Sequence, residues 1–165
     1  MRILGLDPGS HHTGFGIIEP RGGSCRVLAQ GRISCASRQP LPDRLARLTA
    51  ALEVLLADWS PEMAVLETPY HGVNSRSLIV LAQARGALLA TLAGRGVPIE
   101  EYSPAEVKNT VTGNGRAGKD QVGRMVVMLT GIDGDDLSED AADAIAVALC
   151  YAAKRPWRQA LRRFK

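Results

Sequence analysis

Short apolar runs separated by turn residues fill the first part of the chain. The runs at residues 2–6, 13–19 and 25–35 are bounded by Pro-Gly or Gly-Gly pairs, as is typical of turn-linked strands. Leucines then recur four, three, four and three positions apart over residues 41–55, which predicts an amphipathic helix. Residues 64–67 predict a further buried strand. The series strand, helix, strand predicts an α/β fold, a mixed central sheet with a parallel core and flanking helices.

Residues 78–92 differ from the other predicted helices because they are apolar on nearly every side, with Gln83 and Arg85 among the few interruptions. A helix with this pattern must bury more than one face. We therefore expect it either in the centre of the core or at a contact between subunits.

The remainder of the chain predicts one more strand and three more helices, separated by glycine-rich polar turns. The strand is expected at residues 97–102, and the helices begin at Ser103, Asp120 and Ser138. Ser138 is a favourable N-cap for the last of them. Neither a repeat nor a separate linker interrupts the 165 residues, so we expect a single domain spanning residues 1–165.

Four acidic residues lie where apolar elements should be buried. Asp7 and Glu67 each end an apolar strand just before a proline-containing turn. Asp140 and Asp143 are three residues apart, hence on one face of a helix that is otherwise almost all Ala, Ile, Val and Leu. Because functional sites in such sheets form beyond the carboxyl ends of strands, a helix packed on the sheet can bring all four carboxylates into one pocket.

Taken alone, Asp7 is also explained as a turn residue before Pro-Gly, and Asp140 as an ordinary first-turn acid. Together, four carboxylates in one pocket are costly unless cations compensate them. Oxygen ligands suit Mg²⁺ or Mn²⁺, and paired ions about 3.5–4 Å apart are a known arrangement for cutting phosphodiester bonds. One ion would orient and deprotonate water, and the other would stabilise the leaving 3′ oxygen.

Charge is unevenly distributed along a chain whose composition, 45% hydrophobic and 22% charged, is that of an ordinary globular protein. The formal net charge is +3, yet residues 154–165 contain six basic and no acidic side chains. The rest of the chain is therefore net acidic. This basic C-terminal tail is either a solvated end or an arm that contacts phosphates.

The cysteines and the apolar runs bear on the cellular setting. Cys25, Cys35 and Cys150 are odd in number and lack metal-ligand spacing, which argues against a disulfide framework or a structural zinc site. An uninterrupted run of about 18 apolar residues and a charged leader are both missing. We therefore expect a cytoplasmic protein without a membrane partner.

Residues 113–120 formally satisfy the pattern G-x-G-x-x-G and nearly satisfy that of a P-loop. Asp120 stands where the P-loop needs a hydroxyl, and the segment follows a predicted helix instead of a strand, so a mobile basic loop is the better interpretation. His11, His12 and His71 lack partners at metal-ligand spacing. They are interpreted as loop residues or phosphate contacts.

Several short motifs occur in a fixed order along nearly the whole chain. They are Gly-Leu-Asp-Pro-Gly-Ser at 5–10, Thr-Gly-Phe-Gly at 13–16, Leu66-Glu67, Gln-Ala-Arg-Gly at 83–86, Val107-Lys108 with Lys119, and Asp-Ala-Ala-Asp-Ala at 140–144. In this order they resemble the bacterial RuvC Holliday junction resolvases. The resemblance implies an RNase H-like fold and a nuclease that resolves four-way DNA junctions by paired symmetric nicks during recombination and repair.

The resemblance also implies roles for individual residues. The catalytic and metal-binding acids would be Asp7, Glu67, Asp140 and Asp143, and the residues expected to contact DNA are Tyr70, Arg76, Lys108 and Lys119. Tyr70 stands where the family often has Phe, and would stack on an unpaired junction base. The expected cofactor is Mg²⁺, with Mn²⁺ as a substitute and two ions per site. The expected partners are the four-way junction and the RuvA-RuvB branch-migration complex.

A homodimer is also expected, because a junction has two strands to cut symmetrically. The apolar segment at residues 78–92 would form its interface. A charge at Leu81 or Leu88 should then break the dimer.

Two other functions stay open at this point. The acid, glycine and hydroxyl pattern of residues 7–14 also resembles the first phosphate-binding hairpin of actin-like kinases, although those proteins clamp ATP between two such domains and this length supplies one. A scaffold that binds junctions without chemistry would leave the acids unexplained. Hydrolysis of ATP, or a magnesium-dependent nick in a synthetic junction, separates these functions.

Overall fold

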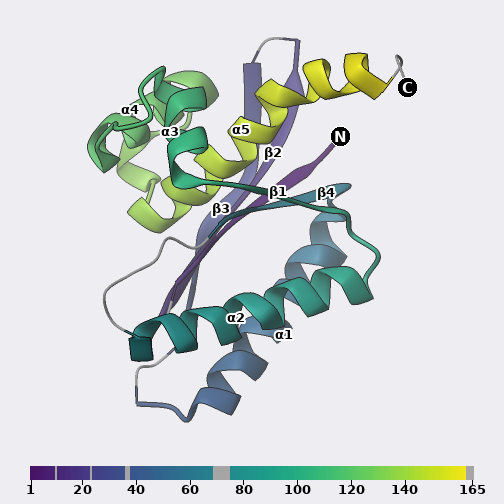
Figure 1. Ribbon diagram of the computed structural model, residues 1–165, viewed down its shortest axis with the longest axis vertical. Coiled ribbons are helices and arrows are strands. Elements are labelled where there is room, and N and C mark those ends of the chain that lie inside the picture. Colours follow the sequence, from purple (N-terminus) through teal and green to yellow (C-terminus); the bar gives the residue numbers. More distant parts are fainter. Residues whose placement is uncertain (10, 23, 36–37, 69–74, 163–165) are drawn as a thin grey trace.

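The computed structural model describes residues 1–9, 11–22, 24–35, 38–68 and 75–162, with backbone only at 75–76 and 156–162. In chain order the elements are β1 (Ile3–Pro8), β2 (His12–Arg21), β3 (Ser24–Ser34), α1 (Leu41–Trp59), β4 (Met63–Glu67), α2 (Ser75–Gly94), β5 (Ile99–Tyr102), α3 (Pro104–Thr112), α4 (Lys119–Thr130), the 3₁₀ turn η1 (Gly134–Asp136) and α5 (Glu139–Arg162). Helices cover both faces of one sheet (Figure 1).

The sheet has the strand order β3-β2-β1-β4-β5. Strands β1, β2 and β3 form an antiparallel meander, whereas β4 and β5 run parallel to β1. The predicted mixed sheet with a parallel core is therefore confirmed. Within it, Asp7 lies opposite Gly14 of β2, and Leu6 lies opposite Leu66 of β4.

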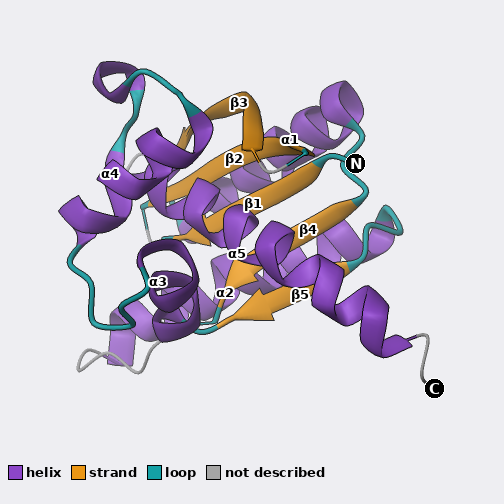
Figure 2. Ribbon diagram, turned by 90° about the horizontal axis from the view of Figure 1, so that it is seen from above, coloured by secondary structure: helices purple, strands orange, loops and turns teal. Residues whose placement is uncertain are grey.

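The two faces of the sheet carry separate hydrophobic clusters. Helices α1 and α2 pack on one face through residues such as Leu52 and Leu88. On the other face α5 crosses the strands, with α3 and α4 packed beside it (Figure 2). Strand residues alternate between the clusters, because successive side chains in a strand point to opposite faces. Ile3 and Val65 belong to the α5 side, and Leu4 to the α1 and α2 side.

Glycines let α5 approach the strands without intervening side chains. A Cβ added at Gly5 would overlap the backbone oxygen of Ala144, and one added at Gly14 would overlap that of Asp140. A Cβ at Gly16, next on the same face of β2, would overlap the side chain of Ile145 and press on its backbone. The backbone of α5 therefore rests directly on β1 and β2.

Two element boundaries differ from the sequence predictions. The polar loop expected up to Ser77 ends earlier, because α2 begins at Ser75 and includes Arg76 in its first turn. The basic stretch from Lys154 is not a separate tail in the described residues, since α5 continues to Arg162. The glycine-rich segment 113–118 follows helix α3, as expected, and this agrees with the rejection of a P-loop.

The apolar helix α2 is partly a core helix and partly exposed. Leu88 and Leu92 are fully buried against α1 and the sheet, whereas Ile79 is 60% exposed. The expectation that Leu88 lies at a subunit interface is therefore wrong, because its side chain fills the core of its own subunit. By length and composition alone, the segment Ser77–Gly94 could cross a membrane.

The close approach of α5 gives a first test. Gly14→Ala should destabilise the protein by about 3 kcal/mol, because a methyl group must displace the first turn of α5 from β2. Gly123→Ala is the matched control: it lies within α4, a Cβ there meets no atom within 4 Å, and it should stabilise the protein by about 0.5–1 kcal/mol. Urea unfolding measures both changes. Equal stability of the two variants would show that α5 does not depend on this contact.

Candidate active site

The strand register places Asp7 and Glu67 side by side on the α5 face. Leu6 and Leu66 are paired across the parallel strands β1 and β4, and the two acids follow them directly. Ile3 and Val65, an even number of residues before the acids, both face α5. Asp7 and Glu67 therefore point towards α5 from the carboxyl ends of neighbouring strands.

The first turns of α5 bring the other two acids over the same edge. The hydroxyl of Ser138 accepts a hydrogen bond from the N–H of Ala141 at 3.3 Å, so the predicted N-cap is confirmed. The backbone oxygen of Asp140 lies against Gly14, the residue opposite Asp7. Asp143 follows one turn later on the same helix face. The four predicted acids therefore lie close together at the carboxyl edge of the sheet, and we call this cluster the acidic pocket.

The pocket raises the affinity of its carboxylates for protons. Burial is the main cause that raises the pKa of Asp7 to about 6, and the charge of Asp143 raises it further while Lys119 opposes the rise. Burial, followed by the charges of Asp7 and Asp143, raises the pKa of Glu67 to about 7, against the opposing charges of Lys108 and Lys119. Burial also raises the pKa of Asp143. The ionised forms of these acids are thus destabilised mainly by burial, and the nearby lysines offset only part of that effect at Asp7 and Glu67.

Three basic side chains supply partial compensation. The ammonium group of Lys119, the first residue of α4, lies 2.7 Å from Oε1 of Glu139 and 3.3 Å from Oδ2 of Asp143. Arg32 of β3 places Nη1 3.5 Å from Oδ2 of Asp140. Lys108 of α3 lies close enough to lower the pKa of Glu67. Each cation comes from a different element.

Sequence analysis missed two of these partners, Arg32 and Glu139. Arg32 lies opposite Gly14 in the β2–β3 ladder, and so faces α5. The sequence feature that could have identified Arg32 is the polar pair Gln30 and Arg32. These two residues lie two apart in a strand whose other face is apolar. Glu139 looks like an ordinary first-turn acid in the sequence. Only the packing of α4 beside α5 shows that it binds Lys119.

The other predicted site residues are less informative. Tyr70 and His71 lie outside the described residues, and only the backbone of Arg76 is described. His11 accepts a hydrogen bond at Nδ1 from Arg44 at 3.4 Å. His12 exchanges one with Ser34 at 3.2 Å. His11 lies in the bend before β2, as the loop interpretation expects, whereas that interpretation is wrong for His12, which is the first residue of β2 and pairs with Ser34 of β3.

The donor set of the pocket fits a hard divalent cation, since every candidate ligand is a carboxylate oxygen. Within the described part of the chain, no group of three or more His, Cys, Asp and Glu side chains is close enough to hold an ion as it stands. Asp140 and Asp143 instead bind Arg32 and Lys119. Binding an ion would require these two acids to exchange a basic side chain for the cation.

The five-stranded mixed sheet with an acidic pocket at its carboxyl edge defines an RNase H-like nuclease fold. The family model described as crossover junction endodeoxyribonuclease RuvC matches residues 3–151. A RuvC protein of Alkalilimnicola ehrlichii is 45% identical over 98% of this chain and 97% of its own length, and one of Moorella thermoacetica is 41% identical over 96% and 95%. The chain therefore belongs to the RuvC family of crossover junction endodeoxyribonucleases, which are metal-dependent nucleases.

Solved structures agree with this assignment. RuvC of T. thermophilus in complex with a Holliday junction substrate matches with a TM-score of 0.90 and 28% identity, over 96% of each chain. The yeast mitochondrial Holliday junction resolvase Ydc2 matches with a TM-score of 0.68 at 14% identity, which shows the shared fold alone. The predicted family and RNase H-like fold are confirmed.

The raised carboxylate pKa values predict how stability depends on pH. In a chelator, the folded protein binds protons at Asp7 and Glu67 more tightly than the unfolded chain, whose acids titrate near 4. The stability that these two groups contribute is therefore fully present below about pH 4, and it is lost as the pH rises through 6 and 7. Urea unfolding of the wild type and of an Asp7→Asn, Glu67→Gln double variant isolates their contribution. A difference that stayed constant between pH 4 and 8 would contradict these pKa shifts.

Proposed function

We propose that this chain resolves four-way DNA junctions by paired symmetric nicks, with divalent ions held in the acidic pocket at each scissile phosphate. The proposed ligands are Asp7, Glu67, Asp140 and Asp143. The observation that supports this most directly is the convergence of four carboxylates from β1, β4 and α5, two of them with strongly raised pKa values, in a chain of the RuvC family.

The proposed cofactor is Mg²⁺, with Mn²⁺ as a substitute and two ions per site. Bound ions would supply charge to activate water and to stabilise the leaving oxygen. The protein contributes the placement of the ligands. Asp7 and Glu67 are fixed by the sheet, whereas Asp140 and Asp143 would release Arg32 and Lys119 when they turn to a cation.

The lysines would then be available to DNA. Lys119 is 63% exposed, and its present partners are the carboxylates of Glu139 and Asp143. Lys108, on α3, is close enough to Glu67 to lower the pKa of that carboxyl. We propose that both contact the scissile phosphate, where a positive charge stabilises the transition state. Tyr70 and Arg76 are proposed to contact the junction itself, Tyr70 by stacking on an open base.

The proposed cellular setting follows the family. A single domain spanning residues 1–165, a cytoplasmic location and cooperation with the RuvA-RuvB complex are proposed. The single domain is supported by the one sheet, whose two faces carry both hydrophobic clusters of the described residues.

We also propose a homodimer that packs through the exposed face of α2. Most of its exposed residues follow one helix face, Ile79, Ala82, Gly86, Ala90 and Ala93, with the exposed Gln83 beside them. Only 22% of the segment Ser77–Gly94 is buried within the chain. Small residues would let two helices approach closely, and a Cβ at Gly86 meets no atom within 4 Å.

A protein partner explains this face better than lipid does. Arg85, in the middle of the segment, donates to the backbone oxygen of Glu67 at 3.2 Å and pairs with Glu101. A charged side chain that binds the catalytic strand of its own domain is not compatible with a helix surrounded by hydrocarbon.

Charges on the exposed face of α2 should dissociate the dimer. Ile79→Glu and Gly86→Glu should each weaken it by roughly 100-fold, because like charges meet across a two-fold axis. Met128→Glu is the matched control, since Met128 is 68% exposed on α4, in the layer on the other side of the sheet. Sedimentation velocity gives the dissociation constants. If both α2 variants had the dissociation constant of the wild-type dimer, this interface would be refuted.

The ion ligands are tested by Asp7→Asn, which keeps the size of the side chain and removes its charge. Cleavage in Mg²⁺ should fall roughly 100-fold or more, because ion binding fails. Junction affinity should persist or rise, since an anionic pocket repels phosphates. Ca²⁺ should permit binding by the wild type without cutting, because its looser coordination misplaces the water.

The matched control for this test is Asp58→Asn, an exposed acid of α1 on the far side of the sheet. It should cut at the wild-type rate. The assay is single-turnover cleavage of a synthetic mobile junction, with binding measured in parallel. Asp7→Asn or Glu67→Gln cutting at the wild-type rate in Mg²⁺ would exclude the proposed site.

A further inference from the structure

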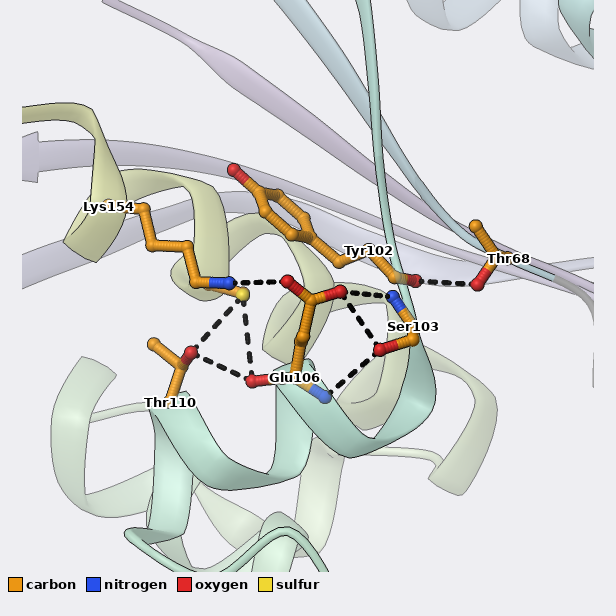
Figure 3. Close-up of polar contacts among 7 residues, drawn as sticks. Thr68, Tyr102, Ser103, Glu106, Thr110 and Lys154 are labelled. Atoms are coloured by element: carbon orange, nitrogen blue, oxygen red, sulfur yellow. Dashed lines mark hydrogen bonds and ion pairs between the residues drawn. The ribbon is translucent and has the colours of Figure 1, made fainter. Parts of the chain in front are cut away.

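A polar network ties the start of α3 to α5 and to the end of β5 (Figure 3). The carboxylate of Glu106 accepts hydrogen bonds from the backbone N–H of Ser103 at 3.0 Å and from its hydroxyl at 2.9 Å. Ser103 in turn accepts from the N–H of Glu106 at 3.3 Å, which completes a capping box. The other oxygen of Glu106 accepts from Lys154 of α5 at 3.0 Å. Glu106 therefore fixes the first turn of α3 and binds a second helix.

The same network reaches the strand that carries Glu67. Thr68, the next residue, donates to the backbone oxygen of Tyr102 through its N–H at 2.8 Å and through its hydroxyl at 3.3 Å. The ammonium group of Lys154 lies 4.5 Å from the centre of the Tyr102 ring (Figure 3). Ser103 follows Tyr102 directly. Lys154 thus contacts both the end of β5 and the start of α3.

Further along α3, the thiol of Cys150 in α5 points to the backbone oxygen of Glu106 at 3.9 Å and to the hydroxyl of Thr110 at 3.4 Å. The bonds from Ser103 and Lys154 lower the pKa of Glu106 to about 2. Glu106 is therefore ionised throughout the neutral range, and its ion pair with Lys154 does not depend on pH there.

Lys108 lies two residues beyond Glu106. Its charge lowers the pKa of Glu67, so it stands near the acidic pocket. Within the described part of the chain, no hydrogen bond or ion pair is found for its ammonium group, so none restrains its side chain. The position of Lys108 relative to Glu67 is consequently set by the placement of α3.

We infer that Lys154 and Glu106 are positioning residues, whose ion pair holds α3 against α5 and β5 so that Lys108 stands at the scissile phosphate. This inference rests on the proposed contact between Lys108 and that phosphate. The same helix α5 carries Asp143, eleven residues before Lys154, or about 16 Å along the helix axis. One rigid helix, α5, therefore sets the positions of its own acids and, through α3, of Lys108.

Energetic magnitudes separate this role from a structural one. Lys154 is 31% exposed and Glu106 51% exposed, and partly exposed ion pairs contribute little to stability. A small misplacement of a catalytic group, in contrast, slows a reaction strongly. Loss of the pair should therefore be seen in the cleavage rate of bound junction and hardly in the unfolding midpoint.

The test uses Lys154→Met, which keeps an unbranched side chain over the Tyr102 ring and removes the charge. In single-turnover assays with saturating protein, cleavage of bound junction should slow roughly tenfold, while junction affinity measured in Ca²⁺ stays within about twofold. Lys154→Arg should restore most of the rate, because arginine can also bind a carboxylate. Glu106→Gln should slow cleavage as Lys154→Met does, since glutamine preserves the capping box.

The decisive measurement is a double-mutant cycle with Lys108→Ala. If Lys154 acts through Lys108, Lys154→Met has no further effect on the rate once Lys108 is removed. A structural role would slow both backgrounds equally. The matched control is Arg21→Met, which breaks an ion pair with Glu19 at the opposite end of the sheet and should leave the rate unchanged.

Each outcome supports or overturns the inference. If Lys108→Ala cleaves slowly but Lys154→Met cleaves at the wild-type rate, the positioning role alone is overturned. Rate effects that multiply in the double-mutant cycle overturn it in the same way. A wild-type rate for Lys108→Ala overturns the proposed phosphate contact and the inference with it. Should Lys154→Met fail to fold, the cycle is run with Glu106→Gln, and multiplicative effects there overturn the inference in the same way.

Discussion

The direct contact between the backbone of α5 and the glycines of β1 and β2 determines the rest of the site. Where Gly5 and Gly14 face Ala144 and Asp140, no side chain can adjust the separation of helix and sheet. The position of Asp143 over Asp7 is therefore set by contacts between backbones, which hardly deform. A divalent cation requires ligand positions within a few tenths of an ångström. Rigid elements meet that requirement better than loops do.

Rigid placement has an electrostatic consequence. Burial is the main cause that raises the pKa values of Asp7 and Glu67, and fixed neighbouring carboxylates raise them further, Asp143 in both cases and Asp7 in the case of Glu67. The compensating charges come from long side chains on elements outside that contact, Lys119 on α4 and Arg32 on β3. The acids have short side chains on a fixed backbone, whereas the bases around them are long and flexible. Cations can therefore replace the bases without a change in the backbone. In the proposed complex, the released bases would face the phosphates that the cations attract.

The sequence correctly predicted those features that depend on hydrophobic periodicity and on local turn and capping residues. The strand end at Glu67, the N-cap at Ser138 and the shared face of Asp140 and Asp143 all depend on local spacing, and the structure has each of them. The strand expected to end at Asp7 continues one residue further, to Pro8. Contacts between distant elements could not be predicted this way. Arg32 reaches Asp140 only because β3 pairs with β2 beneath α5, and Leu88 proves to be core because α1 covers it. The roles of the acids follow from family resemblance and remain a proposal.

Helix α5 has a second effect on the pocket. Helices α3 and α4, which carry Lys108 and Lys119, pack mainly on α5 and on each other. The positions of the two lysines and of the two helical acids therefore all depend on α5, and a small shift of α5 would move all four together. Asp7 and Glu67 belong to the sheet instead, and the glycines of β1 and β2 lock that sheet to α5. The geometry of the whole pocket thus depends on one helix–sheet contact, which explains why glycine, the smallest residue, stands at the three positions where α5 crosses the strands.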